Sequence, residues 1–199
     1  MKRKGILLVV SGPSGAGKGT VCKELLNRND NIDLSISVTT REPRPGEIDG
    51  VSYYFTEKDD FKKKIDEEAF LEYAEVYGNF YGTPKEKVFE KLESGRDVLL
   101  EIDIQGALKV KKIYKDGVFI FIVPPSMQEL KSRLELRGTE TRESMINRFE
   151  SAYREINFVF SYDYVVVNDE VDLATNKLEA IIEAEKCRVH REKNFIEGL

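Results

Sequence analysis

The sequence predicts an α/β fold in which a parallel sheet lies between two layers of helices and carries a small inserted mixed-β lobe. Three observations support this prediction. Short, almost entirely apolar runs recur along the chain, helical segments separate them, and one stretch after residue 34 changes to an alternating pattern. The length of 199 residues fits a single domain with a lobe attached.

The predicted core strands are runs of valine, leucine, isoleucine and phenylalanine with few polar residues. They lie at residues 6–10, 98–102, 118–123 and 164–167. Strands that are apolar on both faces are typical of a parallel sheet covered on both sides by helices. We therefore expect these strands to form the core of the fold.

The helices that separate these strands are marked by capping signals. A helix at 18–27 follows the first strand directly. Thr83, Pro84 and Glu86 match an N-cap, a first helical position and the third residue of a capping box, so they predict a second helix start.

Further helices are expected in the second half of the chain. Ser126 and Glu129 form another capping box, whose helix Gly138 should end. A long helix is expected at 142–160, and a last one at 173–193.

Residues 35–83 break this alternation of apolar strands and helices. Short strands are expected at 35–38, 52–55 and 79–81, with a turn-rich segment at 43–50 and a helix at 58–68. Five of the nine tyrosines fall in this stretch, which suits either strands with one wet face or a site lined with hydroxyls. We therefore divide the chain into a core of residues 1–34 and 84–199 and a lobe of residues 35–83.

Composition excludes several classes of partner. There are 36 acids against 31 bases, which gives a net charge of −5 and argues against nucleic-acid polymers and anionic membranes. No apolar run is long enough for a signal sequence or a membrane span, so we expect a cytoplasmic protein. Cys22 and Cys187 have no metal-ligand spacing, and the single histidine, His190, lies on a charged segment.

A glycine-rich motif follows the first strand and opens the first helix. It consists of Gly12, Pro13, Ser14, Gly15, Ala16, Gly17, Lys18, Gly19 and Thr20. Such a loop directs backbone N–H groups, a helix dipole and a lysine ammonium group at phosphate oxygens. The motif therefore predicts a nucleotide-phosphate site, and a plain glycine turn is the alternative.

Gly19 occupies the position where this motif usually has a serine or threonine that contacts Mg²⁺. Glycine has no hydroxyl. Either Thr20 replaces it, or the metal is held by phosphates and water alone. We assign no direct protein ligand to the metal.

A second anion site is predicted in the lobe. Arg41 and Arg44 lie three residues apart in a segment stiffened by two prolines, and Tyr53 and Tyr81 belong to the same lobe. Pre-ordered guanidinium groups suit phosphate oxygens. A solvated basic turn is the alternative interpretation.

Several stretches in order along residues 6–187 resemble the guanylate kinase family, phosphate-loop kinases that phosphorylate GMP with ATP. The matching stretches are residues 12–18, 37–47, 50–53, 70–73, 78–83, 101–106, 124–126, 137–141 and 167–169. The resemblance implies a P-loop NTPase core, a GMP-binding lobe at 35–83 and an arginine-bearing lid at 137–148. It implies ATP and GMP, and also dGMP, as substrates, Mg²⁺ as the cofactor that accompanies ATP, and a monomer or homodimer.

The resemblance also implies roles for residues of the lobe. The family binds the GMP phosphate with the residues that match Arg41, Arg44, Tyr53 and Tyr81, and reads guanine with those that match Ser37, Glu72 and Thr83. One carboxylate at Glu72 can accept from both N1–H and the N2 amine of guanine, which adenine lacks. Asp103 matches the family aspartate near the acceptor and the metal waters, and Glu101 supports it.

On the ATP side the resemblance implies a lid whose arginines close over the moving phosphoryl group. Arg133, Arg137 and Arg148 match family positions, whereas Arg142 receives no role. Asn168 matches the residue that touches adenine. The expected catalytic residues are Lys18, Arg41, Arg137, Arg148 and Asp103.

Two other functions remain open at this stage. A non-catalytic scaffold of the same family would bind a phosphopeptide, and the intact Gly17 and Lys18 argue against it. Another nucleoside monophosphate kinase is the second alternative, because adenylate kinases use the same Gly-Lys-Gly-Thr form of the loop.

Overall fold

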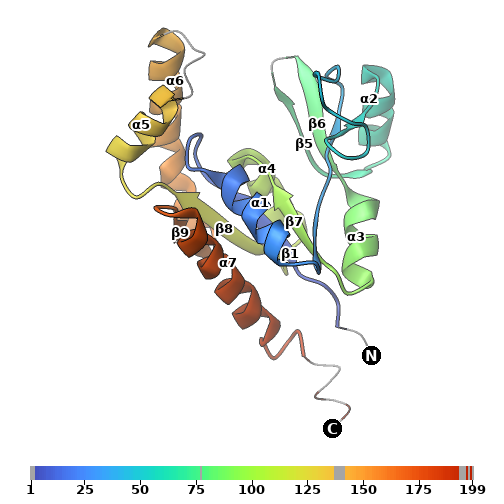
Figure 1. Ribbon diagram of the computed structural model, residues 1–199. Coiled ribbons are helices and arrows are strands. Elements are labelled where there is room, and N and C mark those ends of the chain that lie inside the picture. Colours follow the sequence, from blue (N-terminus) through green and yellow to red (C-terminus); the bar gives the residue numbers. More distant parts are fainter. Residues whose placement is uncertain (1–2, 77, 137–141, 193–195, 197, 199) are drawn as a thin grey trace.

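The computed structural model describes residues 3–76, 78–136, 142–192, 196 and 198, without the side chains of residue 136 and residues 142–148. Figure 1 shows a core sheet flanked by helices and a smaller lobe beside it. The expected α/β architecture with a parallel core sheet is therefore confirmed, and the division of the chain into residues 1–34, 35–83 and 84–199 stays a prediction.

The core sheet is parallel throughout. Its strands are β1 (Leu7–Ser11), β2 (Ile32–Leu34), β7 (Asp97–Glu101), β8 (Val118–Val123) and β9 (Tyr164–Val167), in the order β2-β7-β1-β8-β9. Because all five strands run the same way, their carboxyl ends lie at one edge of the sheet, where open α/β sheets bind ligands.

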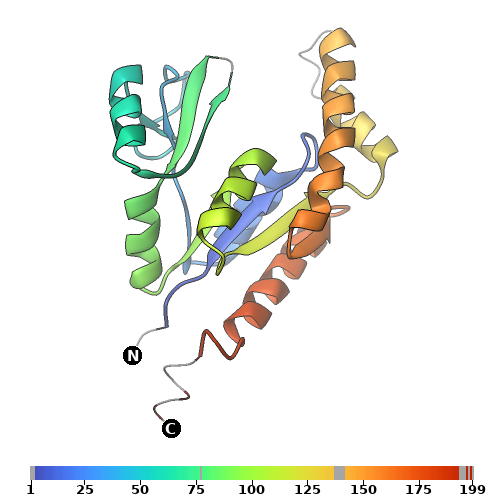
Figure 2. The same ribbon diagram turned by 180° about the vertical axis from the view of Figure 1, so that it is seen from behind.

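Helices cover both faces of this sheet (Figure 2). They are α1 (Lys18–Arg28) and α7 (Val171–Lys186) on one face, and α3 (Lys85–Glu93) and α4 (Ile104–Ile113) on the other. Along β1, Leu8 and Val10 belong to the apolar core shared with α1 and α7, and Leu7 and Val9 to the core shared with α3 and α4. Among the described residues, no helix combines the length and the apolar character needed to span a membrane.

The lobe contains a second, mixed sheet. Its strands are β3 (Val38–Thr39), β4 (Tyr54–Phe55), β5 (Phe70–Val76) and β6 (Asn79–Pro84), in the order β4-β3-β6-β5. Helix α2 (Lys58–Asp66) packs on this sheet through Phe61, whose ring stacks on Phe70 and Phe80 at centroid distances of 4.5 and 5.4 Å. An aromatic stack thus gives the lobe a small core of its own.

A helical unit stands across the molecule from the lobe (Figure 1). It consists of α5 (Met127–Leu136), α6 (Arg142–Glu155) and the 3₁₀ helix η1 (Ile156–Ser161). The buried contact between α5 and α6 is formed by Leu130, Leu134 and Ala152. The predicted cap at the start of α5 is confirmed, because the Glu129 N–H donates to Ser126 Oγ at 3.0 Å.

The expected core strands are confirmed, two of them at their predicted bounds and two shifted by one residue. The sequence interpretation missed β2, β5 and α4. Strand β2 has only three residues, β5 carries a buried glutamate, and α4 begins three residues after a strand and contains a glycine. Each of these features weakens the periodicity on which the prediction depends.

The helix start predicted from Thr83 and Glu86 is wrong in detail. Thr83 belongs to β6, Pro84 is the N-cap of α3, and no side chain caps that helix. The Thr83 hydroxyl donates instead to Glu72 Oε1 at 2.6 Å. The Thr83 hydroxyl, whose oxygen would accept from a helix N–H in a capping box, therefore serves as a donor to a buried carboxylate instead.

Other helix bounds also differ from expectation. The last helix ends at Lys186 and not at residue 193, the helix expected at 142–160 changes to 3₁₀ geometry after Glu155, and α2 ends at Asp66 rather than at residue 68. Gly138, the expected end of α5, lies outside the described residues.

The two cysteines occupy contrasting environments. Cys22 lies on α1 with 1% of its surface exposed, and burial raises the pKa of its thiol far above the usual range. Cys187 directly follows α7 and is exposed. Cys22 is therefore part of the packed core between α1 and the sheet.

Asp97, the first residue of β7, anchors the chain segment that leads into β1. Its side chain is fully buried, and Oδ1 accepts from the Ile6 N–H at 2.8 Å. Arg3 lies 3.5 Å from Oδ1 and Lys186 lies 3.7 Å from Oδ2. One carboxylate therefore joins β1, β7 and the end of α7.

We expect Asp97→Ala to lower the free energy of unfolding by about 3 kcal/mol, because it leaves the buried Ile6 N–H without an acceptor and removes the counter-charge of Arg3. Asp97→Asn, which keeps the acceptor for Ile6, should lose about half as much. Urea unfolding followed by circular dichroism measures both. A loss below about 1 kcal/mol for the alanine variant would contradict this role.

Candidate active site

Three segments meet at the carboxyl edge of the core sheet. They are the loop after β1 (residues 12–17), the turn after β7 (residues 102–103) and the loop after β9 (residues 168–170). The strand order places β1 between β7 and β8, so the glycine-rich loop lies at the centre of this edge.

The glycine-rich loop has a backbone that only glycine adopts easily. Gly12, Gly15 and Gly17 have φ angles of 148°, 87° and 84°. A Cβ atom at Gly12 would collide with the carbonyl oxygen of Ile122, and one at Gly17 with the side-chain amide of Asn168. Gly17 is the N-cap of α1 and no side chain caps that helix, so its first N–H groups are available for an anion.

Lys18 lies along this loop. Its Nζ donates to the Gly12 carbonyl at 2.7 Å and reaches the Pro13 carbonyl at 3.5 Å. Burial lowers the pKa of the ammonium group, and the charges of Glu101 and Glu155 oppose that shift. The lysine is thus a partly desolvated cation held by carbonyl oxygens, and an anion in the loop would attract it.

Glu101, the last residue of β7, lies beside the first turn of α1. A Cβ at Gly19 would come 3.3 Å from Glu101 Oε1, so glycine at this position gives the carboxylate room. Burial raises the pKa of Glu101, and the charge of Lys18 opposes this. The Thr20 side chain is exposed, and the structure places no partner beside it that would assign it to a metal.

Asp103 lies two residues beyond Glu101, where β7 ends, and so it belongs to no strand. Asp103 is instead the N-cap of α4, and its Oδ1 accepts from the Gly106 N–H at 2.8 Å. This cap holds the carboxylate at the start of α4, next to the lobe.

Asn168 is tied to the glycine-rich loop. Its side chain is 3% exposed, and its Nδ2 donates to the Ala16 carbonyl at 2.8 Å. The Oδ1 atom is buried and has no hydrogen-bond partner among the described residues. Arg133 reaches the same segment, donating to the Asn168 carbonyl at 3.0 Å and to Glu129 Oε1 at 2.8 Å.

A cluster of arginine and aromatic side chains lies on the lobe. Arg41 donates to both carboxylate oxygens of Glu47, at 2.8 and 2.9 Å, and its guanidinium carbon lies 5.5 Å from the centre of the Tyr53 ring. The rings of Tyr53 and Tyr81 meet at 6.0 Å. Arg44 is exposed, and its backbone N–H donates to Glu47.

Glu72 is the buried carboxylate of the lobe, with 8% of its surface exposed. Burial raises its pKa, the hydrogen bond from Thr83 partly offsets this, and the charge of Asp103 raises it further. An irregular register between Phe70 and Glu72 in β5 lets Leu71 pack in the core while Glu72 faces Thr83. Ser37, half-buried, directly precedes β3 in the same sheet.

Gly106 connects the two carboxylates of this region. Its N–H is held by Asp103, and a Cβ on it would come 2.9 Å from Glu72 Oε2. The structure therefore brings Glu72, Thr83 and Asp103 together, with a glycine of α4 giving Glu72 its space.

The structure adds three residues to those predicted from the sequence. Glu47 pairs with Arg41, Gly106 packs beside Glu72, and Glu155 accepts a hydrogen bond from the Ser14 N–H at 3.4 Å. Glu47 and Gly106 lie within stretches that resemble the family, so a signal for them existed. Glu155 lies outside every such stretch.

Two predicted arginines cannot be placed. Arg137 lies outside the described residues, and only the backbone of Arg148, within α6, is described.

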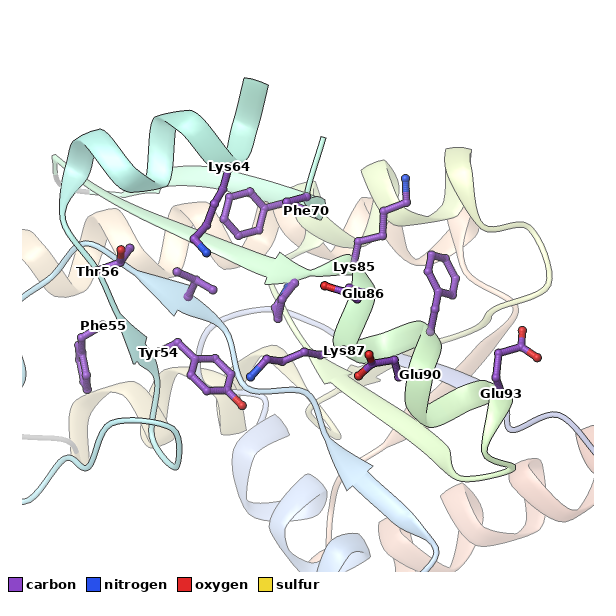
Figure 3. Close-up of a pocket in the computed structure, with 14 residues that line it drawn as sticks. Tyr54, Phe55, Thr56, Lys64, Phe70, Lys85, Glu86, Lys87, Glu90 and Glu93 are labelled. Carbon is purple, nitrogen blue, oxygen red and sulfur yellow. The ribbon is translucent and has the colours of Figure 1, made fainter. Parts of the chain in front are cut away.

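A separate cavity of about 910 Å³ lies where the lobe meets α3 (Figure 3). Tyr54, Phe70 and Phe89 line it, and the Lys87 ammonium group lies 3.6 Å from the centre of the Tyr54 ring. None of the residues predicted to bind nucleotide lines this cavity, so it is distinct from the site described above.

The chain is similar to known proteins of one family along nearly its whole length. The sequence model of the guanylate kinase family matches residues 4–185. Guanylate kinase from Clostridium tetani is 65% identical over 193 residues, covering 97% of this chain and 92% of the relative. Guanylate kinase from Caldanaerobacter subterraneus is 59% identical, covering 98% and 95%. The crystal structure of guanylate kinase from Anaplasma phagocytophilum aligns with a TM-score of 0.77 at 38% identity, covering 96% and 90%.

The raised pKa of Glu72 gives a prediction about stability. Burial penalises the ionised carboxylate, so Glu72 lowers the free energy of unfolding as the pH rises from its ordinary pKa to the higher pKa that it has in the folded chain, and the loss is complete above that range. Glu72→Gln, which still accepts from Thr83, should therefore be more stable than the parent chain at about pH 7.5 and lose that advantage near pH 4. Thermal unfolding of both proteins across this range measures it, and an advantage that does not change with pH would contradict it.

Proposed function

The chain belongs to the guanylate kinase family, and we propose that it transfers the γ-phosphoryl group of ATP to GMP, and also to dGMP, forming ADP and the nucleoside diphosphate. The observation that carries the proposal is the buried Glu72 carboxylate beside Thr83 and Asp103, in a chain whose glycine-rich loop opens at the same edge of the fold. The Glu72 carboxylate is suited to guanine, and the glycine-rich loop is suited to the phosphates of ATP.

We infer that Glu72 selects the base. Its carboxylate can accept from guanine N1–H and N2 together, and Ser37 can donate to guanine O6, while Thr83 holds one Glu72 oxygen in place. Adenine has no hydrogen-bond donor at N1 and no amine on C2, so AMP would leave the buried Glu72 carboxylate without partners in the base. Such a mismatch costs a few kcal/mol.

Arg41, Arg44, Tyr53 and Tyr81 are proposed to bind the phosphate of GMP. Glu47 and Tyr53 hold the Arg41 guanidinium in place, which lowers the entropy lost when a phosphate binds. Arg44 is exposed in the same turn. Residues 35–83 thus act as the acceptor lobe.

The donor side is proposed to consist of the glycine-rich loop, Lys18, Asn168 and Arg133. Loop N–H groups and Lys18 neutralise phosphate charge. The Asn168 Oδ1 atom, buried and without a partner among the described residues, suits a donor on adenine. The lid is assigned to residues 137–148, with Arg137 and Arg148 as its cations, on family resemblance alone.

The donor set fits Mg²⁺ held mainly by the nucleotide. The described part of the chain contains no cluster of three or more His, Cys, Asp or Glu side chains suited to a metal. Glu101 lies beside the start of α1, and Asp103 comes two residues after Glu101 in the chain. When bound with ATP, Mg²⁺ neutralises the β- and γ-phosphates. Glu101 and Asp103 are the side chains that would hold waters of that ion.

The chain's own residues need supply no general base. The attacking oxygen of GMP is already ionised at neutral pH, so the residues orient two phosphates in line and neutralise their charge. Closure of the lobe and the lid on the substrates would exclude water, which prevents hydrolysis of ATP.

A coupled assay of ADP release with GMP, dGMP, AMP and UMP tests the acceptor. We expect Glu72→Gln to lower kcat/KM for GMP about 100-fold relative to AMP, with KM for ATP unchanged. Glu75→Gln, on the exposed side of the same strand, is the matched control and should behave like the parent chain. Preference of the parent chain for AMP would overturn the proposed acceptor.

Gly106→Ala tests the packing behind Glu72. The added methyl group would come 2.9 Å from Glu72 Oε2 and so displace the carboxylate that is proposed to bind guanine. We expect KM for GMP to rise about tenfold while KM for ATP stays the same. Equal changes in both constants would indicate a general loss of folding instead.

A further inference from the structure

Glu155 brings a negative charge to the glycine-rich loop. It is the last residue of α6, half-buried, and its Oε2 accepts from the Ser14 N–H at 3.4 Å. Its other oxygen, Oε1, accepts from the Ser151 hydroxyl at 3.1 Å, one turn earlier on the same helix. The carboxylate is therefore oriented by its own helix and directed at the loop.

A carboxylate at this position competes with phosphate. The loop is built to present N–H groups to anionic oxygens, and a Glu155 oxygen already occupies one of them. Lys18 is engaged in a similar way, because its Nζ donates to the Gly12 carbonyl. Two of the donors expected to serve a nucleotide phosphate are thus engaged by acceptors of the chain itself.

Like charges make this arrangement incompatible with a bound polyphosphate. Two negative charges in contact repel each other more strongly in a partly desolvated loop than in bulk water. A phosphate oxygen that takes the Ser14 N–H therefore has to displace the Glu155 carboxylate.

We propose that Glu155 is a positioning residue of the phosphate loop, whose carboxylate holds the Ser14 N–H until the phosphates of the donor nucleotide displace it. This rests on the proposed use of the loop for ATP. Because Glu155 is the last residue of α6, its displacement breaks a contact between the end of that helix and the loop. Filling of the phosphate site is thereby coupled to release of the end of α6.

Binding of inorganic tripolyphosphate to the full chain, measured by calorimetry without a metal, tests the displacement. Glu155→Gln keeps an acceptor for Ser14 but removes the charge, so it should bind tripolyphosphate about fivefold more tightly than the parent chain. Glu150→Gln removes an exposed charge from the same helix and should bind like the parent chain. In the kinase assay, KM for ATP should fall in Glu155→Gln while KM for GMP does not change.

Equal or weaker binding of tripolyphosphate by Glu155→Gln overturns the proposal when thermal unfolding shows that the variant is folded. Hydrogen exchange of the α6 amides in the parent chain gives a reading that needs no variant. Tripolyphosphate should speed exchange near Glu155, and no change or slower exchange overturns the coupling. Neither measurement uses GMP, so failure of the guanine assignment would leave both results interpretable.

Discussion

The parallel hydrogen bonding of the core sheet is the constraint on which the rest of the molecule depends. Because β1, β7, β8 and β9 run the same way, the glycine-rich loop, Glu101 and Asn168 emerge at one edge without any long connection to bring them there. The pairing of Ser11 with Phe121 also sets Gly12 against the Ile122 carbonyl, and so only glycine fits there. Register in the sheet therefore dictates residue type in the loop.

The acceptor side depends on a contact between the two parts of the fold. Glu72 belongs to the lobe, yet the space for its carboxylate is provided by Gly106 of the core helix α4, whose N–H is capped by Asp103. Base recognition and the start of α4 are thus one structural unit. The lobe carries the recognising group, and the core sets the position that this group can take.

Sequence patterns predicted most of this architecture for identifiable reasons. Continuous apolar runs give unambiguous strands, and the glycine-rich motif between a strand and a helix has few other uses. The failures occur where a tertiary contact outweighs a local signal. Thr83 matches a helix cap but donates to Glu72, and β5 carries the buried Glu72 where alternation predicts an exposed residue. The contact between Glu155 and Ser14 joins residues 141 positions apart, so no local pattern could indicate it.

Because one cysteine is exposed and the other is buried, thiol labelling can detect local unfolding of the chain around the buried one. Cys187 is exposed at the end of α7, whereas the Cys22 thiol is sealed between α1 and the sheet and kept protonated by burial. A thiol reagent in excess therefore labels one site at once and the second only when α1 leaves the sheet. The slow phase of labelling measures how often the helix behind the phosphate loop detaches from the folded protein, without any engineered probe.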